Sequence, residues 1–237
     1  GHFSTVRLTE IFRQAQSSLI ITNAHRINAG QAPELGVKDN DFFFLPRSTD
    51  AEIAQIVTDL CLTRLPRKYG EEAVSGTQVI SPSRKGVAGT ENLNVSLQEA
   101  LNPPSRDKRE YKHRDRVFRE GDRVMQIKNN YELEWFRDDD SEGTGVFNGD
   151  IGVIESINIS SQTVQIKFDD RYVNYEFTLL DELEHAYAIT VHKSQGCEYP
   201  FVIIPIYSAP PMLLTRNLFY TAVTRAKRMV ILVGRAE

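Results

Sequence analysis

Polar side chains follow an apolar run without a break in AITVHKSQGCE (188–198), where a strand is expected to end. In open α/β sheets ligands bind beyond the carboxyl ends of the strands. Thr190 and His192 are donors suited to phosphate and sugar oxygens, and Gly196 lets a backbone approach closely. Glu198 is suited to hold a ribose hydroxyl. The string as a whole predicts a site for a phosphate-containing ligand, although a lone His-Lys pair would indicate only a solvated loop.

A second segment, LTRNLFYTAVTRAKR (214–228), has apolar residues at helical spacing and predicts a helix over about 212–226. Arg225 comes near the end of this helix, where it is able to reach a phosphate on a facing domain, as an arginine finger does in phosphoryl transfer. Basic residues are also favourable at a helix C-terminus for purely electrostatic reasons. Taken alone, the helix therefore favours the electrostatic interpretation over the arginine finger.

Two weaker segments carry further candidates. Arg13 lies in LTEIFRQ, which predicts a short helix, and an arginine on an amphipathic helix more often belongs to a solvated face. VISPSRKGVAGTENLN (79–94) reads as a strand, a glycine-bracketed loop and a helix start, with Ser81, Arg84 and Asn94 along it. Small hydroxyls, cations and a helix N-terminus suit the backbone of a single-stranded nucleic acid. A capped turn between strand and helix is an equally good interpretation.

The chain lacks the motif that would bind a nucleoside triphosphate unaided. No G-x-x-x-x-G-K-[ST] phosphate loop occurs, nor does the dipeptide Gly-Lys. A metal-binding Cys/His cluster, a G-x-S-x-G elbow and a G-x-G-x-x-G fingerprint are also missing from the sequence. Since the chain begins GHFSTVRLTE rather than with Met, we expect it to be a piece of a longer protein.

The elements that must position these residues are of two kinds. Up to residue 101, strand signals at 41–46 and 77–82 alternate with helical ones, including a capping box at Thr49 and Glu52, which predicts a mainly parallel sheet. Between about 115 and 184, four or five short strands separated by turn residues predict a small antiparallel barrel. The α/β pattern then returns, so the barrel is expected to be an insertion.

Composition and charge exclude several classes of protein. The 237 residues carry 28 Lys+Arg and 32 Asp+Glu, and the apolar runs are far shorter than the roughly 20 residues of a membrane span. Two cysteines make no disulfide scaffold, so we expect a globular, cytoplasmic protein with no membrane association. Residues 102–128 hold nine basic residues against five acids, whereas 131–182 hold three against thirteen. The basic stretch allows a polyanionic partner, and a solvated surface is the alternative.

Four sequence motifs follow one another along the chain: FRQ (12–14), ISPSRKGVAGTENLN (80–94), TVHKSQGCE (190–198) and NLFYTAVTRAK (217–227). In this combination the chain resembles superfamily 1 DNA helicases, in particular the RecD-like type, the exonuclease V alpha-subunit family. The likeness covers essentially the whole chain. The last two strings correspond to motifs V and VI and are the most specific. FNGDIGVI (147–154) resembles the start of the family's small Src-homology-3-like insertion.

The resemblance implies a fold and a domain plan. The fold is a RecA-like (P-loop NTPase-like) parallel-sheet α/β domain without its own Walker A motif, carrying an inserted small antiparallel β-barrel. The first segment of this motor domain would be 1–114, the barrel 115–184 and the final segment 185–237. In the family, the phosphate loop and the acidic Mg²⁺ motif lie in a preceding RecA-like domain. The chain is thus expected to be the second motor domain of an ATP-dependent 5′→3′ DNA helicase of repair and recombination, and inactive alone.

The resemblance also implies residue roles. Arg13 and Arg225 would reach the γ-phosphate of ATP, while Gly196 and Glu198 would contact the sugar side of the nucleotide. ATP and Mg²⁺ would be held mainly by the N-terminal motor domain. Single-stranded DNA and the duplex junction would be partners, and nuclease subunits are further candidates. The residues implied to hold the DNA backbone are Ser81, Arg84, Asn94, Thr190 and His192.

Two other interpretations stay open at this point. One is a non-catalytic module that binds nucleic acid or docks a partner on a decayed motor fold. The other is the helicase part of a conjugative relaxase, since such enzymes share motifs V and VI. A small-molecule α/β enzyme would need a cofactor fingerprint, which the sequence lacks.

Overall fold

A five-stranded parallel sheet forms the centre of the first structural unit in the computed structural model, which describes residues 18–37, 40–207 and 215–235. The strand order is β1-β14-β13-β2-β12. Strand β13 and the stretch 229–234 of β14 are almost wholly buried and rich in Val and Ile, as expected for a sheet covered on both faces. The strands are β1 (Phe42–Pro46), β2 (Thr77–Ser81), β12 (Ala188–Thr190), β13 (Tyr199–Ile206) and β14 (Ala226–Gly234).

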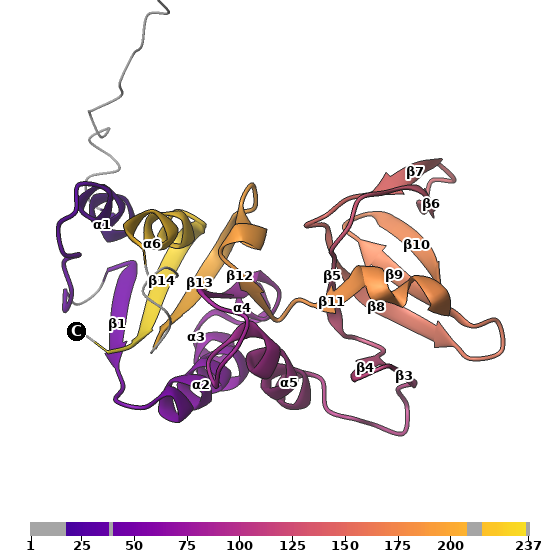
Figure 1. The fold of residues 1–237 in the computed structure, drawn as a ribbon, viewed down its shortest axis with the longest axis horizontal. Coiled ribbons are helices and arrows are strands. Elements are labelled where there is room, and N and C mark those ends of the chain that lie inside the picture. The colour runs from indigo at the N-terminus through magenta and orange to yellow at the C-terminus, as the bar shows by residue number, and fades with distance from the viewer. Residues whose placement is uncertain (1–17, 38–39, 208–214, 236–237) are drawn as a thin grey trace, which may run out of the picture.

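Helices cover both faces of this sheet, and each face has its own hydrophobic cluster (Figure 1). The helices α1 (Leu19–Asn28) and α6 (Arg216–Val223) pack side by side on one face. The other face carries α2 (Asp50–Asp59), α3 (Leu65–Tyr69), α4 (Glu71–Gly76) and α5 (Thr90–Leu101). A π-helical segment at Leu60–Arg64 joins α2 to α3. The predicted capping box is confirmed, because Thr49 and Glu52 bond each other's backbone amides.

The predicted helix over 212–226 is wrong in its C-terminal bound. Helix α6 ends at Val223, and Thr224 caps it with a helical backbone. The Thr224 hydroxyl and the Arg225 Nε both donate to the carbonyl of Thr221, which satisfies an acceptor that the ended helix leaves open. Arg225 therefore stands in the short turn before β14 rather than on the helix. Residues 212–214 of that prediction lie outside the described ranges.

The second unit is a curled antiparallel sheet of seven strands in the order β11-β5-β8-β9-β10-β6-β7 (Figure 1). Its core is one cluster that includes Phe118, Ile166 and Tyr175. The sequence indicates only four or five strands here, because β6 buries a single residue, Leu133, and so shows no clear alternation. The strands are β5 (Arg123–Gln126), β6 (Asn130–Phe136), β7 (Glu142–Val146), β8 (Ile151–Asn158), β9 (Thr163–Phe168), β10 (Arg171–Glu176) and β11 (Leu183–His185).

A small hairpin joins α5 to the seven-stranded sheet. It consists of β3 (Glu110–His113) and β4 (Arg116–Arg119), and Arg114 in its turn adopts a positive φ of 56°. The antiparallel sheet itself runs from residue 123 to 185, and the boundaries 114/115 and 184/185 stay a prediction. Within the described ranges no helix is long and apolar enough to cross a bilayer.

Candidate functional site

The structure brings Arg225 against the segment that carries Gly196 and Glu198. The Arg225 Nη1 donates to the carbonyl of Cys197 at 3.2 Å, and its Nη2 donates to the Thr224 hydroxyl at 3.2 Å. In return, the Tyr199 amide donates to the Arg225 carbonyl at 2.8 Å. Arg225 is thus held against a segment whose predicted site residues, Glu198 and Gly196, lie 27 and 29 positions before it in the sequence.

The charge of Arg225 is not neutralised by a direct ion pair. Among the described residues, no carboxylate lies within 4.0 Å of its guanidinium, whose three contacts are to carbonyl and hydroxyl oxygens. The side chain is half-buried, which keeps its electrostatic effect stronger than in bulk water. Such a guanidinium is suited to an anion that arrives from outside this chain.

Gly196 and Glu198 are both exposed beside this arginine. Gly196 has a φ of +84°, a conformation that favours glycine, and a Cβ there would meet nothing within 4 Å. Glu198 pairs with Lys227 at 3.0 Å. The hydrogen bond from Lys227 lowers the pKa of Glu198, and the nearby charge of Arg225 lowers it further. Arg13, the other predicted arginine finger, lies outside the described residues.

Four of the five predicted DNA-contacting residues line a single pocket of about 230 Å³: Arg84, Asn94, Thr190 and His192. Thr190 ends β12, and His192 is exposed on the 3₁₀ helix His192–Ser194 that follows. Arg84 reaches the pocket from the loop after β2. The strand-end position predicted for the 188–198 segment is therefore confirmed, and the second loop reaches the same place.

The polar groups of Ser81 and Asn94 form hydrogen bonds within the protein itself. Ser81 is fully buried, and its hydroxyl donates to the Ala88 carbonyl at 3.0 Å and lies 3.2 Å from the Tyr207 hydroxyl. The Asn94 side-chain amide forms two hydrogen bonds with the backbone of Ala188: Nδ2 donates to the carbonyl at 2.9 Å and Oδ1 accepts from the backbone N–H at 2.8 Å. This pair of bonds ties α5 to the edge strand β12. Of the two residues only Asn94 lines the pocket, and a DNA contact by either stays a prediction.

One residue at this site has no signal in the sequence. Glu184, in β11, accepts from Arg84 Nη2 at 2.9 Å and from Lys193 Nζ at 3.1 Å, and lies 3.6 Å from Arg116 Nη2. Burial raises the pKa of Glu184, but the charges of Lys193, Arg84 and Arg116 together outweigh it, and the net pKa lies below the ordinary value. Glu184 is therefore ionised at neutral pH.

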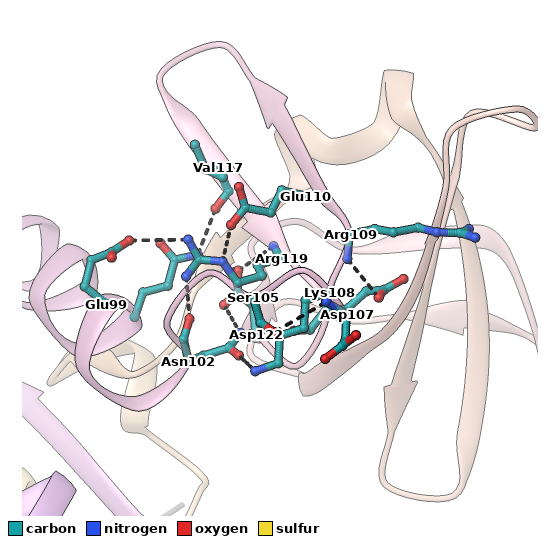
Figure 2. A network of polar contacts seen from close by, with 12 residues as sticks. Glu99, Asn102, Ser105, Asp107, Lys108, Arg109, Glu110, Val117, Arg119 and Asp122 are labelled. Carbon is teal, nitrogen blue, oxygen red and sulfur yellow. Dashed lines mark hydrogen bonds and ion pairs between the residues drawn. The ribbon is translucent and has the colours of Figure 1, made fainter.

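A buried polar network lies where the hairpin connects α5 to the seven-stranded sheet, which is the predicted barrel, and Figure 2 shows the centre of this network. Arg119 is 3% exposed and donates to the Glu110 carboxylate, to the carbonyl of Asn102 and, at 3.4 Å, to Glu99. Asp122, fully buried, accepts from the Arg119 amide at 2.7 Å. The network fixes the hairpin and the start of the barrel against the end of α5.

Comparisons with known proteins agree with this architecture. The family model described as the SH3 domain of ATP-dependent RecD-like DNA helicases matches residues 93–168, and the UvrD-like helicase C-terminal domain matches 185–233. The ATP-dependent RecD2 DNA helicase of Deinococcus radiodurans is 33% identical over 98% of this chain and 29% of its own length. The RecBCD enzyme subunit RecD of Mycobacterium tuberculosis is 39% identical over 39% of this chain and 16% of its own length.

Solved structures show the same fold. A Pif1 helicase from Bacteroides, in complex with ADP-AlF3 and ssDNA, is 19% identical with a TM-score of 0.54, over 96% of this chain and 51% of that one. The Pif1 helicase from Candida albicans is 14% identical with a TM-score of 0.52, over 94% of this chain and 55% of that one. The fold of this chain is therefore one that these helicases share over about half of their length.

Within that class the two domain matches and the relatives identify the chain as a C-terminal region of the RecD-like helicases. It spans less than a third of the length of the Deinococcus radiodurans relative.

Proposed function

We propose that this chain is the second motor domain of an ATP-dependent 5′→3′ DNA helicase or translocase. The observation that carries the proposal is the contact of Arg225 with the 196–198 segment, because it brings together the two segments that resemble motifs V and VI. The matches to the RecD-like SH3 domain and to the UvrD-like helicase C-terminal domain support the same assignment. Since the sequence has no phosphate loop, this surface would act against a nucleotide held mainly by an N-terminal motor domain.

The residues present fit the phosphate and sugar ends of ATP. Arg225 has no carboxylate partner among the described residues, and Gly196 leaves open space beside it. Bound ATP with Mg²⁺ supplies the phosphoryl group whose transfer to water drives the motor. Arg225, with Arg13, would stabilise the negative charge at the γ-phosphate, the role of an arginine finger. Glu198 would hold the sugar side after leaving Lys227.

The pocket at the end of β12 is proposed to grip single-stranded DNA. Arg84 and His192 are exposed there and Thr190 is half-buried, so all three present polar groups to a ligand. Groups of this kind contact phosphates and sugars rather than base edges, so binding should tolerate any sequence and weaken as salt rises. Ser81 and Asn94 would act by holding this pocket in shape.

Partners and location follow from the same proposal. The duplex junction and the N-terminal motor domain would be partners of this chain, and nuclease subunits are a further proposal, since one relative is named a RecBCD subunit. A DNA helicase of this kind would work in the cytoplasm, at the chromosome.

Unwinding by the full-length protein tests the proposal. Duplexes with a 5′ or a 3′ single-stranded tail are incubated with ATP and Mg²⁺, and strand separation is followed by fluorescence. We expect unwinding of the 5′-tailed duplex, its loss in Arg225→Ala, and its retention in Arg228→Ala, since Arg228 pairs with Glu72 of α4 and neither of these residues is a predicted site residue. Unwinding of neither duplex would favour the non-catalytic binding module, and equal unwinding by Arg225→Ala would refute the role of Arg225.

A further inference from the structure

Three cations from three separate parts of the chain converge on the single carboxylate of Glu184. Arg84 comes from the loop after β2, Arg116 from the hairpin strand β4, and Lys193 from the 3₁₀ helix after β12. The Arg84 and Lys193 contacts are 2.9 and 3.1 Å, and Arg116 lies at 3.6 Å. The hairpin, the loop after β2 and the 3₁₀ helix after β12 thus meet at one carboxylate.

The geometry of this cluster is one that a phosphate also satisfies. Guanidinium and ammonium groups bind carboxylate and phosphate oxygens with similar distances and charge. Glu184 uses one oxygen for the two arginines and the other for Lys193, as two non-bridging oxygens of a phosphodiester would be used. The side chains are reachable, because Arg84 is 54% exposed, Arg116 34% and Lys193 27%.

The cluster also adjoins the proposed DNA pocket. Arg84, Glu184 and Lys193 line that pocket together with Thr190 and His192. A second groove lined by Arg84, Arg116 and Glu184 runs on toward the hairpin, between α5 and β4. A backbone lying at Thr190 would therefore have its next phosphates near these cations.

We propose that Glu184 is a displaceable internal counter-ion of the DNA-backbone site. Without DNA it keeps Arg84, Arg116 and Lys193 gathered and limits their attraction for other polyanions. A DNA phosphate takes its place among the three cations, so Arg116 and Lys193 become contacts of the grip. The inference rests on the proposed function, and it assigns a part in binding to one particular residue of the basic stretch 102–128, Arg116 of the hairpin.

The variant Glu184→Gln tests the proposal, because it removes the competing charge and preserves the size of the side chain. Glu91→Gln is the matched control, since Glu91 lies 3.5 Å from Arg84 but touches neither of the other two cations. Binding of a fluorescent oligo-dT to the nucleotide-free full-length protein is measured by anisotropy over a range of salt concentrations. We expect Glu184→Gln to lower the Kd about fivefold at low salt, the effect of about 1 kcal/mol for one removed charge in water. Glu91→Gln should change the Kd less than twofold.

A second variant keeps the test independent of how well the first one folds. Lys193→Ala should raise the Kd and reduce the slope of log K against log salt by about 0.7, the value for one lost phosphate contact on a single strand. An unchanged or higher Kd for Glu184→Gln, or an unchanged slope for Lys193→Ala, would overturn the inference while oligo-dT binding by the unaltered protein leaves the proposed function standing. Failure of the unaltered protein to bind oligo-dT would overturn both.

Discussion

Replacing Asp122 by alanine removes the acceptor at the centre of the junction between α5 and the barrel. Four donors lose a hydrogen bond: Gln98 Nε2 at 2.6 Å, the Arg119 amide at 2.7 Å, Asn102 Nδ2 at 2.8 Å and the Tyr187 hydroxyl at 3.0 Å. The ring of the part-buried His185 also loses the 3.2 Å contact of its Nε2. Two of the four donors keep another acceptor, because Gln98 also donates to the Val117 carbonyl and Asn102 to that of Glu120.

The expected loss of stability follows from the other two donors. Among the described contacts, Asp122 is the only acceptor of the Arg119 amide and of the Tyr187 hydroxyl, and all three groups lie in the interior. A buried donor left without a partner costs about 1–3 kcal/mol, so two of them should lower the free energy of unfolding by about 2–6 kcal/mol.

Urea unfolding of the chain, with the free energy extrapolated to water, measures this loss. Asp115→Ala is the control, since Asp115 is an exposed acid in the turn of the adjoining hairpin, and it should change stability by less than about 0.5 kcal/mol. Tyr187→Phe alone should cost about 1 kcal/mol, but in the Asp122→Ala background it should recover about 1 kcal/mol or more, because it removes a hydroxyl that has lost its acceptor. A loss below 1 kcal/mol for Asp122→Ala, or fully additive effects in the double variant, would refute the reasoning.

Three further predictions concern the loops and the titratable groups. Gly89→Ala should lower the melting temperature and weaken oligo-dT binding, because its Cβ would lie 2.4 Å from the Lys85 carbonyl oxygen; an unchanged Kd would contradict this. Burial raises the pKa of Cys61 to about 12, so at pH 8 iodoacetamide should alkylate the half-buried Cys197 and spare Cys61, as mass spectrometry would show; equal labelling would contradict it. The pKa of Glu184 is lowered in the folded state, so its carboxylate stabilises the protein fully above the unfolded pKa near 4.3. This stabilisation is lost as pH falls through the folded pKa. The melting-temperature difference between the protein and Glu184→Gln should therefore shrink below about pH 4.

The parallel sheet and its order of segments could be predicted because local signals carry them. Buried parallel strands read as continuous apolar runs, as β13 and β14 do, and the Thr49 capping box fixes the start of α2 through contacts three residues apart. The end of α6 could not be predicted in the same way. It depends on a threonine hydroxyl and the Arg225 side chain both bonding the Thr221 carbonyl, which apolar spacing does not record.

In the candidate site, too, local sequence signals predict some residues, whereas others depend on partners that are distant in the chain. The strand-end position of Thr190 and His192 follows from the apolar run before them, so the sequence sufficed. The roles of Glu184 and Asp122 depend on partners that are up to 100 positions away in the chain, and a single acid in a mixed sequence gives no hint of them. Ser81 shows the converse case. A hydroxyl just before a glycine-rich loop suggests ligand contact, whereas in the structure Ser81 is buried and its hydroxyl donates to Ala88 of that loop.

ATP hydrolysis by the full-length protein, with and without single-stranded DNA, tests the central claim most directly. We predict strong stimulation by DNA that disappears in Arg225→Ala, while Arg228→Ala keeps it, and no hydrolysis by this chain alone. Stimulated turnover that survives Arg225→Ala, or DNA-stimulated turnover by the chain alone, would contradict the account.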